Sequence, residues 1–425
     1  MRDSDPTGSV LRFRDFRLLW SGQAISTLGD QLFPVAVTIA VLNSTRDNAS
    51  AVGVVLACRW LALVLFVMIG GVWADRLPRR LVMMGADAYR AVVVLALAAV
   101  PDPPLWLLAG LVFLVGGGEA FFRPAYGALV PTVVPAGRLA AANALTSMSF
   151  RTGAIVGPAL SAAIAESTGP RPAFALDALT FLVSLATLWR VVEPAHQPRA
   201  RQHLVTDIRE GLAEVWRQRW IATILALAAV QLMMVMAPTN VLLPVIGRRE
   251  FHTDSVYALS LALMSVGGLL GAIASLRWKP RRRGLVGMVG LLLWVVVPLA
   301  LLHPVHAWLI YAAYFAAGLG TEPFIVFWAS ALQEEVHRDM LARVTSLDWL
   351  CSFALMPVGL ALTGPAAAGL GESSVLWAAV LVASVPTLFV LAVPGVARFR
   401  HPRPTGADSG GTPTLPGQPA PGTSS

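Results

Sequence analysis

Apolar runs long enough to cross a lipid bilayer recur along almost the whole of this 425-residue chain. A helix needs about 20 mostly apolar residues to span the hydrocarbon core. Only 13% of the residues are charged, whereas an ordinary soluble domain carries roughly 25%. The pattern predicts a polytopic membrane protein. It excludes a soluble enzyme or a nucleic-acid-binding domain, in spite of the net charge of +8.

The apolar runs fall into two sets of six. The first set lies at 18–42, 51–73, 81–100, 105–129, 139–166 and 171–192. The second set lies at 220–246, 254–276, 284–302, 306–332, 341–368 and 373–393. We therefore predict an all-α membrane protein of twelve transmembrane helices, in two six-helix halves at 18–192 and 220–393. The remaining predicted parts are an N-terminal segment at 1–17, a linker at 193–219 and a disordered tail at 394–425.

The basic residues set the expected orientation. If the N-terminus is cytoplasmic, most of the 32 lysines and arginines fall in cytoplasmic segments, as the positive-inside rule requires. We expect both termini in the cytoplasm and a multi-pass protein of the inner (cytoplasmic) membrane. The excess of basic over acidic residues is then explained by topology and by contact with membrane lipids, so no nucleic-acid partner is expected. Cys58 and Cys351 lie inside apolar runs, which argues against a disulfide framework or zinc site.

The two halves resemble each other at an offset close to 200 residues. Trp20 and Trp220 open the first and seventh spans after basic residues, and Pro158 and Pro357 interrupt the fifth and eleventh spans. Parallel halves of this kind are typical of secondary transporters, whose substrate site lies between the halves near the midplane.

The loop between the second and third spans carries a recognisable motif. It reads Gly71-Val-Trp-Ala-Asp75-Arg76-Leu-Pro-Arg79-Arg80, which resembles the signature G-x-x-x-D-R-x-G-R-R of the major facilitator superfamily. The segments at 16–23 and 122–125, with the Gly29–Asp30 pair, resemble the branch that contains the enterobactin exporter and macrolide efflux proteins. The resemblance covers everything but the ends of the chain. It departs from the signature at position 78, where proline replaces glycine, and at 277–283, where the second half has no aspartate.

The resemblance implies a role for this loop. Asp75 and Arg76 would form a latch that holds the cytoplasmic helix ends together by charged hydrogen bonds and releases them when the helices move. For Arg79 and Arg80, anchoring to anionic lipid headgroups is the alternative.

The fifth span contains Gly153, Gly157 and Pro158 in a segment that resembles the antiporter signature G-x-x-x-G-P-x-x-G-G of exporting members. Glycines four residues apart let helices approach closely, and proline bends a helix. Ser161 and Ala162 stand where the signature has glycines, and small residues at this spacing occur in any membrane bundle. The motif favours an exporter.

Ionisable side chains within the spans mark functional candidates, because they are costly in hydrocarbon. Asp30 lies roughly 18 Å along the first span, near the midplane, and is the first candidate for proton binding; a structural aspartate is the alternative. Glu322, before Pro323, is a second proton candidate. Glu119 and Arg123, at i and i+4, suit an intrahelical ion pair better than a coupling site. Arg151 is expected to neutralise Asp30 or Glu119, or to bind an anionic substrate group.

The other polar residues in the spans have weaker assignments. Asp87 and Arg90 are predicted to form a structural pair, and Asp348 to pair with Arg343. Two ionisable residues carry no predicted role: Arg59 and Asp177. The candidates for the substrate cavity, with contacts between helices or core packing as the alternative, are Gln231, Asn240 and Trp328.

The sequence thus predicts a secondary active transporter rather than an enzyme. It has no Walker lysine to drive an ATP pump and no acidic cluster at a helix end for a metal-dependent transferase, so neither a metal nor a cofactor is expected beyond a proton gradient. The expected activity is export of a small amphipathic compound, such as a drug, macrolide or siderophore, by proton antiport and alternating access. A proton-coupled uptake symporter is the alternative, and a monomer is expected.

Overall fold

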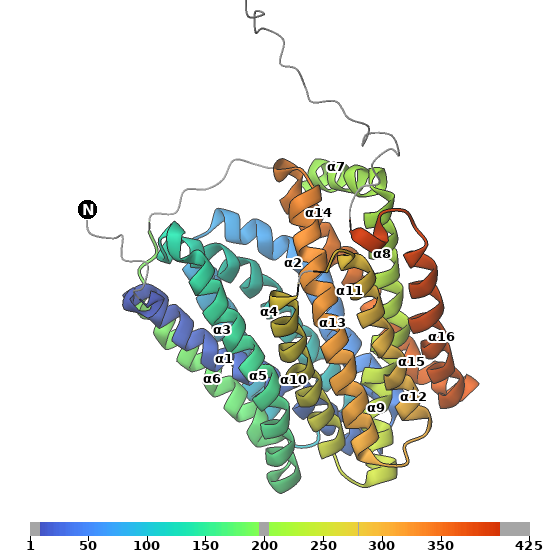
Figure 1. Ribbon diagram of the computed structural model, residues 1–425. Helices are drawn as coiled ribbons and strands as arrows, with labels where there is room; N and C mark the ends of the chain where they lie inside the picture. Colours follow the sequence, from blue (N-terminus) through green and yellow to red (C-terminus); the bar gives the residue numbers. More distant parts are fainter. Residues whose placement is uncertain (1–8, 195–203, 279, 400–425) are drawn as a thin grey trace, which may run out of the picture.

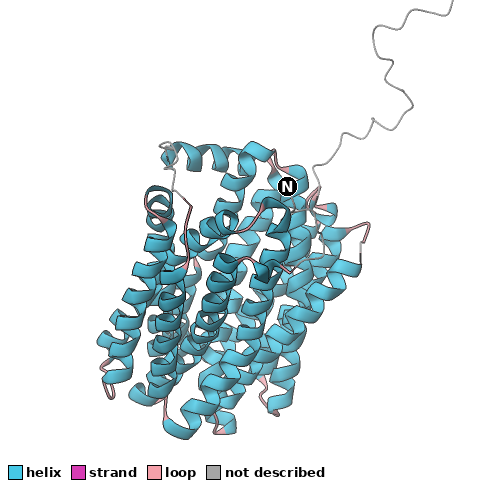
Figure 2. Ribbon diagram, turned by 90° about the vertical axis from the view of Figure 1, so that its left-hand side faces the viewer, coloured by secondary structure: helices cyan, strands magenta, loops and turns pink. Residues whose placement is uncertain are grey.

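Long helices running side by side make up the described part of the chain (Figure 1). The computed structural model describes residues 9–194, 204–278 and 280–399, and within these every regular element is helical (Figure 2). Each predicted span of the first half forms one helix. These are α1 (Arg14–Thr45), α2 (Ala49–Arg76), α3 (Arg79–Ala99), α4 (Leu105–Val133), α5 (Leu139–Thr168) and α6 (Arg171–Arg190).

Three predicted spans of the second half are interrupted. The seventh consists of α8 (Arg219–Gln231), a π-helical turn (Leu232–Met236) and α9 (Ala237–Phe251). Pro238 lacks the N–H that would close a regular α-turn there. The ninth span consists of α11 (Arg283–Leu292), a 3₁₀ turn (Leu293–Val295) and α12 (Val296–Leu302), and the eleventh of α14 (Arg338–Phe353) and α15 (Met356–Leu370). The uninterrupted helices are α10 (Ser255–Arg277), α13 (Ala307–Glu335) and α16 (Glu372–Leu391).

Within the described residues, 11 helices are long and apolar enough to cross a membrane, counting α8–α9, α11–α12 and α14–α15 as one each. The predicted span outside this group is α5, whose first half carries Asn143, Thr146, Ser147 and Arg151. It nevertheless packs against α1 of its own half and α10 of the other. Of its polar residues, Asn143 and Ser147 are exposed, and Thr146 and Arg151 are half-buried. The count of twelve spans and the cytoplasmic location of the termini stay predictions.

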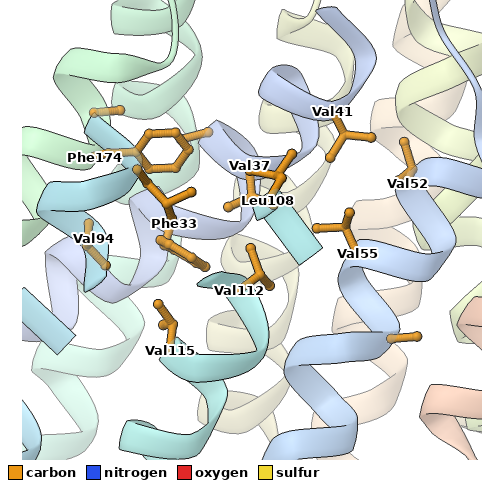
Figure 3. Close-up of a cluster of buried hydrophobic side chains, with 14 of the residues drawn as sticks. Phe33, Val37, Val41, Val52, Val55, Val94, Leu108, Val112, Val115 and Phe174 are labelled. Atoms are coloured by element: carbon orange, nitrogen blue, oxygen red, sulfur yellow. The ribbon is translucent and has the colours of Figure 1, made fainter. Parts of the chain in front are cut away.

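The core of the first half is built from interlocking aliphatic and aromatic side chains. Figure 3 shows Phe33 and Val37 of α1 packed with Val112 of α4 and Phe174 of α6. All four are buried, and the rings of Phe33 and Phe174 lie 5.9 Å apart. Close packing of this kind holds α1, α4 and α6 as one unit, so charged groups between these helices are held in fixed positions.

The linker contains a helix, and the start of the tail is more ordered than the sequence predicts. Inside the linker, α7 (Leu204–Arg217) packs against α14, and Arg343 donates to Glu210 over 2.5 Å. The predicted disorder from residue 394 is wrong for 394–399, because Val396 and Phe399 are buried in the core of the second half. The remaining residues of the predicted N-terminal segment, linker and tail (1–8, 195–203 and 400–425) lie outside the described residues.

The two halves meet along α2 with α15 and α5 with α10. Several of these contacts lie at the end of the bundle away from α7, where α9 turns into α10 (Figure 1); we call this end the distal face. There a Cβ on Gly53 would lie 2.2 Å from the carbonyl oxygen of Leu360, so only glycine permits this approach. Arg248 reaches Asp47 at 3.0 Å, and the Thr253 hydroxyl donates to Glu166 over 2.6 Å. These contacts join the two halves at the distal face.

Candidate functional site

Seven ionisable side chains gather inside the first half, where α1, α2, α3, α4 and α6 meet. We call this group the buried charge cluster. Its members are Asp30, Arg59, Asp87, Arg90, Glu119, Arg123 and Asp177. A set of this size inside a bundle of apolar helices is expensive to bury unless each charge is compensated.

Arg90 lies at the centre of the buried charge cluster, with 1% of its side chain exposed. It donates to Asp87 over 2.5 Å and to Asp30 over 3.2 Å. Its guanidinium also lies 4.6 Å from the ring of Phe122 and 4.2 Å from the ring of Phe181, where cation–π attraction adds to the ion pairs. The predicted Asp87–Arg90 pair is confirmed. The contact of Arg90 with Asp30 was not predicted.

Asp87 is held from a second side. It accepts a hydrogen bond from the Ser184 hydroxyl at 2.7 Å, and Ser184 in turn accepts one from the Gln23 amide at 2.9 Å. Asp87 is fully buried, so each of these bonds is made in a low-dielectric setting. The chain of hydrogen bonds fixes Asp87, and through it Arg90, to α6 and α1.

Glu119 is the second anionic centre of the buried charge cluster. It pairs with Arg123, as its i,i+4 spacing predicts, and this pair is confirmed. It also accepts two hydrogen bonds from Arg59, at 3.0 and 3.2 Å, which assigns a partner to an arginine that the sequence left without one. With two arginines around it and 9% of its side chain exposed, Glu119 is compensated as a structural anion. Its candidacy as a proton carrier stays a prediction.

Asp30 differs from Asp87, the other carboxylate that Arg90 binds, in how much of its side chain is exposed. About a third of its side chain (35%) is exposed, whereas Asp87 is fully buried. A carboxylate that is ion-paired on one side and open on the other can exchange a proton with water while remaining in a fixed position. This geometry suits the predicted proton-binding role of Asp30.

Arg151 pairs with Glu322, not with Asp30 or Glu119. Two hydrogen bonds, of 3.2 and 3.0 Å, join the guanidinium on α5 to the carboxylate on α13. Both side chains are partly exposed, 29% for Arg151 and 21% for Glu322. The predicted partners of Arg151 are wrong because its helix faces the second half at this depth. The ion pair crosses the boundary between the halves, so rocking of one half against the other acts on it directly.

The Arg151–Glu322 pair can be tested with a double-mutant cycle. We expect Arg151→Gln and Glu322→Gln each to slow transport, and the double variant to be no slower than the worse single variant. The coupling energy should be about 0.5–3 kcal/mol. The matched control is Arg283 with Glu334, an exposed pair at 2.7 Å within the second half, for which less than about 1 kcal/mol is expected. Strictly additive effects at Arg151 and Glu322 would contradict the assignment.

The glycines of the antiporter-like segment pack α5 against α1 inside the first half. A Cβ on Gly157 would lie 2.6 Å from the Cβ of Gln31, and Gly153 faces Thr27. Ser161, which stands where the signature has glycine, donates to the carbonyl oxygen of Leu32 over 2.9 Å. The segment therefore joins α5 closely to the helix that carries Asp30. Its bearing on the direction of transport stays a prediction.

The loop after α2 is fixed through the start of α3. The backbone N–H groups of Arg79 and Arg80 donate to the carboxylate of Glu193, at 3.1 and 2.9 Å. A carboxylate at a helix N-terminus is favoured by the helix dipole and the free N–H groups. Asp75 is half-buried and Arg76 exposed at the end of α2. The latch and the lipid anchoring both stay predictions.

The three residues of the second half that were predicted to line the substrate cavity have different surroundings in the structure. Gln231 donates to Thr387 over 2.7 Å, which is a contact between helices. Trp328 is buried against Trp220 and donates to Asp348 over 3.1 Å. The predicted pairing of Asp348 with Arg343 is therefore wrong. The indole N–H of Trp328 binds Asp348, and Arg343 binds Glu210 on α7 instead. Asn240 is half-buried on α9.

Apolar helices in two halves, an ion pair across their boundary and a partly exposed carboxylate inside one half are features expected of a membrane transporter. The match of residues 19–359 to the family model of the Major Facilitator Superfamily makes the assignment specific: the chain belongs to that superfamily.

Comparison with individual proteins agrees with this family. The chain is 26% identical over 362 residues to macrolide efflux protein A of Streptococcus pyogenes, covering 82% of this chain and 88% of the relative. It is 28% identical to the multidrug efflux pump Tap of Mycolicibacterium fortuitum, over 81% and 87% of the two chains. The enterobactin exporter EntS of Citrobacter koseri is 25% identical, over 92% and 94%. The crystal structure of a bacterial homologue of the iron transporter ferroportin has the same fold, with a TM-score of 0.69 at 16% identity, over 91% and 100%.

Proposed function

We propose that this transporter exports a small amphipathic compound, of the drug, macrolide or siderophore class, across the cytoplasmic membrane in exchange for protons. The observation that carries the proposal is the setting of Asp30 and Glu322. Each carboxylate is partly exposed, each is paired with an arginine, and each lies within helices that are otherwise apolar. Protonating either one weakens its ion pair, so proton binding and helix arrangement are linked.

The direction of transport is inferred from the relatives. Three proteins that match most of this chain are named for efflux or export of macrolides, multiple drugs or enterobactin. In the proposed cycle the halves alternate about the boundary between α5 and α10. The distal face, closed here by Gly53 with Leu360 and by Arg248 with Asp47, opens after the compound has bound from the cytoplasmic side, and a proton then enters from outside.

The proposal is tested in everted membrane vesicles with an acidic interior, monitored with a pH-sensitive dye. The compounds to add are macrolides, other hydrophobic drugs and siderophores, with vesicles that lack the protein as control. Proton efflux on adding one compound class supports antiport and identifies the substrate class. Proton movement together with the compound in the same direction would contradict antiport and favour the uptake symporter.

A further inference from the structure

Asp177 on α6 is a member of the buried charge cluster that has no role in the proposed function. It is 1% exposed, and both of its carboxyl oxygens are buried without a hydrogen-bond partner among the described residues. A charged carboxylate in such a place costs several kcal/mol or more, so it takes up a proton and becomes neutral instead.

The packing of α6 on α1 places Asp177 next to Asp30. A Cβ on Gly29 would lie 2.5 Å from Oδ1 of Asp177 and 2.2 Å from the hydroxyl of Thr180. Only a glycine at position 29 leaves room for this carboxyl group. Asp177 therefore touches the backbone of α1 at the residue before Asp30, close enough for the charges of Asp30 and Arg90 to act on it.

Counting charges in the buried charge cluster identifies Asp177 as the surplus acid. Glu119 is compensated by Arg59 and Arg123. Arg90 is shared between Asp30 and Asp87. No arginine donates to Asp177 among the described residues, so four carboxyl groups face three guanidiniums, and neutrality requires one bound proton.

Arg90 has one N–H group that is available to bind Asp177. Its Nε–H is buried without a partner among the described residues, while its two other nitrogens bind Asp87 and Asp30. If the proton passes from Asp177 to Asp30, the hold of Asp30 on Arg90 weakens and Asp177 is left ionised. The guanidinium can then compensate a second carboxylate nearby.

The remaining helix packed against α6 adds no charge to this group. That helix, α5, carries Arg151 and Glu166. Arg151 is bound to Glu322, and Glu166 is bound to Thr253 and Ser255. The protonation of Asp177 is therefore set by Asp30, Asp87 and Arg90, with Arg59 and Glu119 beyond them.

We propose that Asp177 and Asp30 share a single proton, and that Arg90 is the counter-charge of whichever carboxylate is ionised. In the conformation described here the proton is on Asp177 and Arg90 is on Asp30. In the alternative state Asp30 holds the proton and Arg90 compensates Asp177. The proton enters and leaves through Asp30, which is the exposed member. This inference rests on the proposed function only in taking the proton as the coupling ion.

The shared proton is tested first without any substrate, by infrared spectroscopy of the purified full-length protein at neutral pH. The wild-type protein should show the carbonyl stretch of a protonated carboxyl group that is absent from Asp177→Asn. It should also be absent from Asp30→Asn, because Asp177 then ionises against Arg90. Asp102→Asn, at an exposed loop carboxylate of the same half, should keep the band. An unchanged band in Asp177→Asn overturns the proposal, and a band that persists in Asp30→Asn overturns the sharing.

A transport measurement separates this inference from the proposed function. In proteoliposomes, Asp177→Asn should keep substrate exchange without a gradient, because asparagine mimics the neutral acid, and should lose transport driven by a pH gradient. If the wild-type protein moves no protons with substrate, the proposed function fails while the infrared result still decides the shared proton. If wild type and Asp177→Asn couple equally, with the same pH profile, the inference alone fails.

Discussion

Replacing Arg90 with methionine is expected to lower the free energy of unfolding by about 3–5 kcal/mol, the cost of removing one partner from a buried ion pair. Arg90 compensates Asp30 and Asp87 and lies between the rings of Phe122 and Phe181. Methionine fills the space but leaves Asp87 fully buried, with the Ser184 hydroxyl as its remaining donor among the described residues, so Asp87 must either stay charged at a high cost or take up a proton. The measurement is denaturant unfolding of the purified protein in detergent, supported by the yield of folded protein.

Arg123→Met is the matched control for Arg90→Met. Arg123 also pairs with a carboxylate of the buried charge cluster, but 49% of its side chain is exposed and Glu119 keeps Arg59 as a second partner. We expect a loss below about 1 kcal/mol. Arg90→Lys should fall between the two variants, because an ammonium keeps the charge but does not bind two carboxylates in a planar fork. Equal stability of Arg90→Met and Arg123→Met would show that Arg90 does not hold the helices together.

The second large effect is expected at Asp30. Asp30→Asn should reduce gradient-driven transport to the level of vesicles that lack the protein, because the amide cannot bind and release a proton. The amide oxygen can still accept from Arg90, at the 3.2 Å contact that the carboxylate makes now, so folding should be preserved. Expression level and thermal unfolding are measured beside ΔpH-driven transport, with Asp102→Asn as the control. Full gradient-driven activity in Asp30→Asn would remove this residue from the mechanism.

The fold was predictable from the sequence because the bilayer imposes one length on every span. Each predicted span of the first half coincides with one helix, from α1 to α6. The breaks inside the seventh, ninth and eleventh spans were not predicted, because an apolar run reads the same whether it is one helix or two joined by a turn. The burial of Phe399 was missed for a related reason: a single aromatic residue in a polar stretch carries no periodic pattern.

The site was predictable only where partners lie on the same helix. The pairs Glu119–Arg123 and Asp87–Arg90 follow from spacings of four and three residues on a helix surface. The contacts of Arg90 with Asp30 and of Arg151 with Glu322 depend on how far each helix is rotated and shifted against its neighbours. The sequence alone does not give these rotations and shifts. Asp177 had one available signal, an aspartate within an apolar run, but only the folded structure shows that none of the described residues donates a hydrogen bond to its carboxyl oxygens.

The central claim is that an inward proton gradient drives export. It is tested most directly with purified protein in proteoliposomes, by following accumulation of a labelled compound of the class found in the vesicle assay. With an acidic interior and the cytoplasmic side of the protein outward, we expect accumulation above the outside concentration. The accumulation should collapse when a protonophore removes the gradient, and it should be absent in Asp30→Asn. Accumulation that is unaffected by the protonophore, or that needs an alkaline interior, would contradict the account.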